Sequence, residues 1–163
     1  MVGLEGKNNM SDALAFPSLN IFLAIGGTLS FLAGILHLAC IVGGPDWLRF
    51  FGAGEALARM AEKGHWYPAF VTGVIALVLF GMSTYAFVGA VQSDAAGVPM
   101  ALPLLKWGLI AITAVYMLRG ALPFVVGMAK PVILTPFTIW SSAIVLVFGL
   151  VHLVGLVQVW ARL

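Results

Sequence analysis

The chain has 163 residues, of which 62% are hydrophobic and only 9% are charged, and its mean hydropathy is +1.09. Soluble domains are about half apolar and a quarter charged, so this composition excludes an ordinary soluble enzyme, a disordered protein and a nucleic-acid-binding protein. The net charge of +2 is too small to attract a partner by charge. The single cysteine, Cys40, excludes an internal disulfide framework. We therefore expect one transmembrane domain that comprises residues 1–163.

Four segments are long and apolar enough to cross a bilayer, which takes about 20 residues. They are residues 20–42, 69–91, 103–125 and 137–160. Asn20 and Thr135 are typical N-terminal caps, Pro136 suits the first turn of a helix, and the glycines at 43–44 suit a helix stop. The predicted fold is all-α: an integral membrane four-helix up-down bundle with one short interfacial helix in the first linker.

The linker between the first two spans, residues 43–68, is the longest predicted extramembrane piece. Gly52 and Gly54 argue against one straight helix through it. Residues 55–63 have helical spacing of apolar side chains and are followed by Gly64, which predicts a short helix. We expect this helix to lie on the membrane surface or to cap the mouth of the bundle.

Four spans place the linkers 43–68 and 126–136 on one side of the membrane and both termini on the other. The basic residues counted on the linker side are Arg49, Arg59, Lys63, Lys130 and Arg119, and those on the terminal side are Lys7, Lys106 and Arg162. This imbalance favours cytoplasmic linkers and external termini. The richness in Ala, Gly, Val and Leu is compatible with a bacterial inner membrane.

Small residues recur at helical spacing in the first and fourth spans. The first stripe contains Gly26, Ser30, Gly34 and His37, and the second contains Ser142, Val145, Gly149, His152 and Leu156. Lipid provides no hydrophobic drive between helices, so small residues usually mark the faces on which helices make contact. We therefore expect both histidines to point into the protein.

His37 and His152 are functional candidates because ionisable side chains inside a span are costly. The alternative is a neutral imidazole that is bonded to a carbonyl or to a neighbouring helix. The two residues lie at similar distances from the starts of antiparallel helices, which places them in opposite leaflets, about 15 Å apart along the membrane normal. They cannot then be the two axial ligands of one haem iron, and no set of ligands for another metal accompanies them.

Arg119 lies deep in the third span, about 24 Å along the helix from Pro103. Tyr116 precedes it by one turn. Pro123 follows it by four residues and removes the helical hydrogen bond to its carbonyl, which predicts a kink or an early helix end. Arg119 either faces protein or extends its guanidinium to the membrane surface.

Several of these polar residues belong to the same half of the membrane in the four-span arrangement. A polar pocket under the first linker would be lined by Arg119, Glu55, His37, Tyr116 and Arg49, and His152 is a further candidate ligand-binding residue. The alternative for Glu55 is a local ion pair with Arg59, four residues later on the same helix.

The sequence assigns no catalytic residue, metal ligand or cofactor, and it leaves open whether the protein is an enzyme. The expected partners are the lipid bilayer and either a lipid or quinone-like ligand or a larger membrane complex. The first hypothesis is an accessory subunit or an amphiphile-binding module that uses the polar pocket. The alternatives are a membrane enzyme acting on a lipid-like substrate, with Glu55 or His37 as acid or base and Arg119 holding an anionic headgroup, and a small transporter. A transporter would need oligomers, because an isolated four-helix bundle has a filled core.

Overall fold

The computed structural model describes residues 19–91 and 102–163, which are almost entirely helical and contain no strand. The long helices are α2 (Ile21–Phe50), α4 (Tyr67–Val91), α5 (Leu105–Ala129) and α6 (Pro136–Val159); the shorter elements are α3 (Glu55–Glu62) and the 3-10 turns η1 (Pro131–Ile133) and η2 (Trp160–Arg162). Each long helix has the length and apolar composition to cross a membrane. The predicted all-helical membrane fold, with a short helix between the first two spans, is confirmed.

Two helix starts have the caps that the sequence predicts. The Asn20 side chain accepts a hydrogen bond from the Leu23 backbone N–H at 2.9 Å, and the Thr135 hydroxyl accepts one from the Thr138 N–H at 3.1 Å. Each cap satisfies a backbone donor that has no partner within its helix. Pro136 occupies the first position of α6, where a missing N–H costs nothing.

The first long helix does not stop at the glycine pair as predicted; it kinks there. Gly44 has φ 71° and ψ −153°, a conformation outside the helical region, and Pro45 follows it. A positive φ of this kind is accessible mainly to glycine. The chain then resumes its helical path to Phe50, so α2 extends eight residues beyond the expected end at residue 42.

The third long helix continues through Pro123 and ends only at Ala129. The alternative of an early helix end at this proline is therefore wrong. The lost hydrogen bond to the Arg119 carbonyl is a local gap in a helix that continues on both sides.

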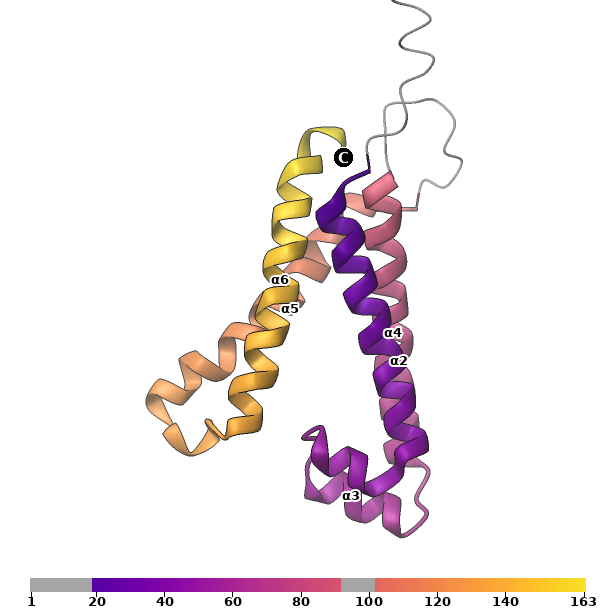
Figure 1. Cartoon of the computed structure of the whole chain (residues 1–163), viewed down its shortest axis with the longest axis vertical. Coiled ribbons are helices and arrows are strands. Elements are labelled where there is room, and N and C mark those ends of the chain that lie inside the picture. The colour runs from indigo at the N-terminus through magenta and orange to yellow at the C-terminus, as the bar shows by residue number, and fades with distance from the viewer. Residues whose placement is uncertain (1–18, 92–101) are drawn as a thin grey trace, which may run out of the picture.

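The helices form two hairpins, in which α2 lies along α4 and α5 lies along α6 (Figure 1). The hairpins meet at the end of the bundle where α2 begins and α6 finishes, which we call the terminal end. A buried cluster there takes side chains from all four long helices: Leu23, Ala90, Leu105, Leu109, Leu156 and Val159. Away from this cluster the long helices of the two hairpins diverge toward the opposite, linker end, which carries α3 and η1 (Figure 1). At that end the turn at Gly52, after α2, lies against the ring of Phe137 of α6.

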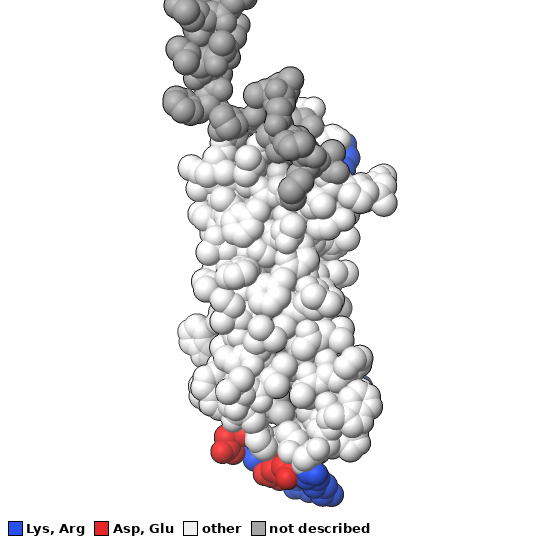
Figure 2. Space-filling view, turned by 90° about the vertical axis from the view of Figure 1, so that its right-hand side faces the viewer, with Lys and Arg blue, Asp and Glu red and all other residues white. Residues whose placement is uncertain are grey.

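The short helix α3 folds back on the first hairpin at the linker end. Ala58 is fully buried and packs with Cys40 and Leu48 of α2. The helix finishes just before Gly64, which has φ 70°, in agreement with the predicted stop. Figure 2 shows acidic and basic side chains gathered at this end, with an uncharged stretch of surface between them and the terminal end.

Candidate functional site

Polar side chains join the two hairpins in the terminal half of the bundle. The Ser30 hydroxyl donates a hydrogen bond to the Gly26 carbonyl at 2.9 Å, so it accepts its second hydrogen bond from the Tyr116 hydroxyl, 2.8 Å away. Both side chains are buried. Hydroxyl groups are stable at such a depth only when they are hydrogen-bonded, so this pair ties α5 to α2 at a fixed position.

His152 of α6 lies in the same region and is 0% exposed. Its Nδ1 is 2.8 Å from the Phe148 carbonyl, to which it donates, so Nε2 of the neutral ring is an acceptor. This buried Nε2 has no hydrogen-bond partner within the described residues. The imidazole lies against Gly26, and its ring centre is 5.1 Å from that of Tyr116. The expectation that His152 points into the protein is confirmed.

His37 repeats the local geometry of His152 at a different depth. Its Nδ1 is 2.8 Å from the Ala33 carbonyl, four residues earlier, but its side chain is only half-buried. His152 lies against Gly26 of α2. His37 is 11 residues farther along the same helix, which corresponds to about 16 Å of helical rise. The two histidines therefore lie at different depths, as predicted, and this geometry excludes a single iron ligated by both.

Arg49 is the centre of an ion-pair network at the linker end. Its guanidinium lies 2.9 Å from Glu55, 2.7 Å from Glu62 and 3.4 Å from Asp46. Arg59 also binds Glu55 at 2.9 Å, so the local pair that the spacing predicts is present. Hydrogen bonds lower the pKa of Glu55 to about 2; the larger contribution comes from Arg49 and the next from Arg59. Every acidic residue of the described part of the chain is thereby bound to Arg49.

Arg119 stands outside this network. Its Nη1 is 3.4 Å from the hydroxyl of Ser142 on α6, and no carboxylate of residues 19–91 or 102–163 lies within 4.0 Å of it. A guanidinium keeps its charge and offers five N–H donors. Arg119 is about 15 Å of helical rise from the end of α5 at Ala129. It is therefore a positive charge inside a membrane-spanning helix with no counter-charge in the described structure.

Two polar side chains of α2 and α5 are less buried than residues on the same helix faces nearer the terminal end. On α2, Gly26 and Ser30 are buried, whereas His37, three turns after Gly26 and on the same face, is only half-buried. On α5, Ile112 is buried, whereas Arg119, two turns later on the same face, is exposed. The hairpins thus cover each other near Ser30 and leave His37 half-buried and Arg119 exposed farther along. We call these two residues the inner-face cluster, together with the buried Ser142, which is bonded to Arg119, and the buried Tyr116, which lies one turn before Arg119.

The predicted site residues fall into separate groups. Arg49 and Glu55 bind each other at the linker end. Tyr116 and His152 lie together where the hairpins meet, and Arg119 follows Tyr116 by one turn of α5. The hypothetical pair between Glu55 and Arg119 is not formed, because Glu55 is held by two other arginines. Ligand binding by any of these residues remains a prediction.

Three side-chain contacts between distant parts of the chain were not predicted: Ser30 with Tyr116, Ser142 with Arg119, and Asn20 with Gln158. Ser30 and Ser142 belong to the small-residue stripes, a pattern that indicates close packing and does not specify which distant hydroxyl or guanidinium each serine meets. Asn20 is hydrogen-bonded to Gln158 at 2.9 Å, which connects the start of α2 to the end of α6. Nothing in the local sequence indicates that contact, because the two residues are far apart in the chain.

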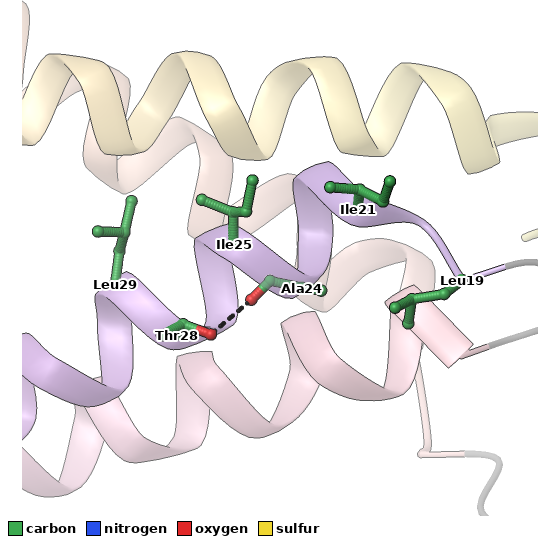
Figure 3. Close-up of a pocket in the computed structure, with 6 residues that line it drawn as sticks. All are labelled: Leu19, Ile21, Ala24, Ile25, Thr28 and Leu29. Atoms are coloured by element: carbon green, nitrogen blue, oxygen red, sulfur yellow. Dashed lines mark hydrogen bonds between the residues drawn. The ribbon is translucent and has the colours of Figure 1, made fainter.

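A shallow hollow of about 250 Å³ lies elsewhere, near the start of α2 (Figure 3). It is lined by Leu19, Ile21, Ala24, Ile25, Thr28 and Leu29. The lining is apolar, and its one hydroxyl, that of Thr28, donates to the Ala24 carbonyl at 2.9 Å. Such a surface suits lipid chains in general and offers no group that would select a ligand, so the inner-face cluster is the stronger candidate.

No protein-family model matches the chain, and no curated protein or solved structure is detectably similar to it. Its function is therefore inferred from the geometry of its own residues.

Proposed function

We propose that the protein is a membrane-embedded module that binds an amphiphile between its two hairpins, in the half of the bundle nearer the linker end. The observation that carries this proposal is the loss of burial along the inner faces. The same faces that are closed by Ser30 and Tyr116 expose Arg119 and leave His37 half-covered. Polar groups that are left uncovered at membrane depth are costly unless something binds them.

The chemistry of the surroundings favours an amphiphile over a soluble metabolite. The cluster lies between helices whose exposed side chains are mostly apolar, such as Leu36 and Leu118. A ligand there needs an apolar body to replace lipid chains and one polar group to meet the cluster. A lipid or a quinone-like molecule has both. An accessory role, in which a helix of a partner protein fills the same space, is the competing function.

Mass spectrometry of the intact protein, extracted in a mild detergent, tests the proposal. We expect an added mass in the range of lipids or quinones, at one fixed stoichiometry. His37→Trp places a bulky side chain on the inner face and should remove the added mass. Val42→Trp is the matched control, because Val42 of α2 is 90% exposed and its side chain is free to face lipid; this variant should keep the added mass.

The outcomes separate the two functions. Wild-type protein that remains bare, both after extraction and after incubation with membrane lipids, contradicts ligand binding. An added mass of polypeptide size supports the accessory role and contradicts the amphiphile. Loss of the ligand in both tryptophan variants would show that the binding is not confined to the inner face.

A further inference from the structure

We infer that the ligand is an anionic amphiphile whose headgroup is bound by the guanidinium of Arg119, with the hydroxyl of Ser142 beside it. This inference rests on the proposed function and names its ligand class. It starts from charge: in residues 19–91 and 102–163 the acidic side chains are Asp46, Glu55 and Glu62, and all of them bind Arg49. None of them is left to neutralise Arg119.

The position of Arg119 makes the missing counter-charge costly. A charged side chain near the middle of a span is costly unless it is paired or reaches water. Its one hydrogen bond within the described structure, to Ser142, is long at 3.4 Å and involves a neutral partner. An anion supplied by the bilayer would satisfy the charge without any rearrangement of the Arg49 network.

The geometry of the group selects the kind of anion. A guanidinium presents two parallel N–H groups that match a carboxylate or a phosphate ester. Nη1 is the nitrogen that faces Ser142, so the remaining N–H groups are available to a headgroup. The Ser142 hydroxyl is fully buried on α6 and accepts a hydrogen bond from Nη1, so it helps to hold the guanidinium in position. We commit to a phospholipid headgroup because the cluster opens between apolar, lipid-exposed helices.

The test measures lipid binding to the full-length protein in detergent, by titration followed by intact-protein mass spectrometry. The probes are phosphatidylglycerol, diacylglycerol with the same acyl chains, which lacks the phosphate, and inorganic phosphate. We expect the wild type to bind phosphatidylglycerol about tenfold or more tightly than diacylglycerol, as one charge-assisted hydrogen-bonded pair implies. Arg119→Gln should abolish this preference and leave diacylglycerol binding unchanged, which also shows that the variant is folded.

Matched variants distinguish a specific headgroup site from diffuse charge. Arg119→Lys keeps the charge but loses the paired N–H groups, so it should recover only part of the preference. Lys130→Gln removes one exposed positive charge at the linker end and should have no effect. Ser142→Ala should weaken phosphatidylglycerol binding. Ser141→Ala should not, because the Ser141 hydroxyl is bonded to the Thr138 carbonyl of its own helix.

Each contrary result has a separate meaning. Equal binding of the two lipids by the wild type and by Arg119→Gln overturns the headgroup assignment and leaves the amphiphile function in place. Binding of neither lipid overturns both. Inorganic phosphate that displaces phosphatidylglycerol at equal concentration would identify a soluble anion as the ligand and overturn the lipid source. If Arg119→Lys kept the full preference for phosphatidylglycerol and Lys130→Gln lost part of it, the specific site would be overturned.

Discussion

A histidine ring occupies the space beside Gly26 that a side chain would need. A Cβ at position 26 would lie 2.7 Å from Cε1 of His152 and 2.9 Å from its Nδ1, closer than atoms can pack. The ring cannot turn away freely, because its Nδ1 is bonded to the Phe148 carbonyl. The small residue predicted at this contact is therefore required by one particular neighbour, which the stripe in the sequence could not identify.

Gly26→Ala should destabilise the protein by about 1–3 kcal/mol, the usual cost of adding a methyl group to a filled interior. Thermal unfolding in a mild detergent measures the change. Gly81→Ala is the control, because a Cβ at this exposed position of α4 would meet nothing within 4 Å. It should be neutral or stabilising by up to about 1 kcal/mol, the helix preference of alanine over glycine. If the two variants changed the stability by the same amount, Gly26 and His152 would not be in contact.

Glu55 should make the packing of α3 sensitive to acid. Its pKa is about 2 in the folded protein, against an ordinary value of 4.5, because Arg49 and Arg59 donate hydrogen bonds to its carboxylate. Since the folded pKa is the lower one, the ion pairs contribute stability above pH 4.5 and lose that contribution as the pH falls toward 2.

Two measurements check this expectation: the carbon chemical shift of the Glu55 carboxyl and hydrogen exchange of the α3 amides. The shift should titrate well below pH 4.5, and the protection factors of the amides, which correct for the intrinsic pH dependence of exchange, should fall over the same range. In Glu55→Gln this fall in protection should largely disappear. A carboxyl that titrates at its ordinary value would show that Glu55 is free in solution.

At the scale of elements, the kink of α2 depends on one backbone conformation. The φ of 71° and ψ of −153° at Gly44 belong to a region that residues with a Cβ essentially never adopt. A Cβ there would meet nothing within 4 Å, so the constraint is conformational and not steric. The kink turns the last residues of α2 toward α3, where Leu48 is buried with Cys40 and Ala58.

Gly44→Ala should therefore either cost about 1–3 kcal/mol of stability or straighten α2 and release α3 from it. Thermal unfolding reports the first outcome, and increased proteolysis within residues 45–66 reports the second. Gly73→Ala, in a helical position of α4 with its nearest neighbour at an ordinary 3.8 Å, should produce neither effect. An unchanged Gly44→Ala variant would mean that the kink is not required.

The elements themselves could be predicted because their signals are local. Apolar length defines the spans, Asn20 and Thr135 define helix starts, and Gly64 defines the end of α3. The divergence of the hairpins could not be predicted, because the spacing of small residues shows which faces touch and not over what length. The Arg49 network was missed for a different reason: it requires a kink at Gly44, where the sequence indicated only a helix stop.

At the scale of the whole molecule, the charged side chains at the two ends of the bundle have different kinds of partner. At the linker end the acidic side chains are gathered around Arg49, so that end is nearly self-neutralised. At the terminal end of the described structure, Lys106 lies over the ring of Trp160 at 4.1 Å, a cation–π contact of the kind that suits an interface. Arg119 lies within α5, which runs between the two ends. Its charge therefore requires something that the described helices do not supply.

The arrangement of spans predicts which positions share a side of the membrane. Lys63 follows α3 and Lys130 follows α5, so both belong to the linker end, whereas Ala161 follows α6 at the opposite end. In a Cys40→Ser background, the single variants Lys63→Cys and Lys130→Cys should react together with a membrane-impermeant thiol reagent. Ala161→Cys should react only from the other side.

The excess of basic residues at the linkers further predicts that Lys63→Cys and Lys130→Cys are protected in intact cells and react after lysis. Ala161→Cys should react in intact cells. A complete reversal of this pattern would overturn the orientation but keep the four-span fold, because all three positions would still be divided in the same way. Labelling of Lys63→Cys and Lys130→Cys from opposite sides would instead overturn the fold. It would place an odd number of membrane crossings between α3 and η1, where the structure has the two helices α4 and α5.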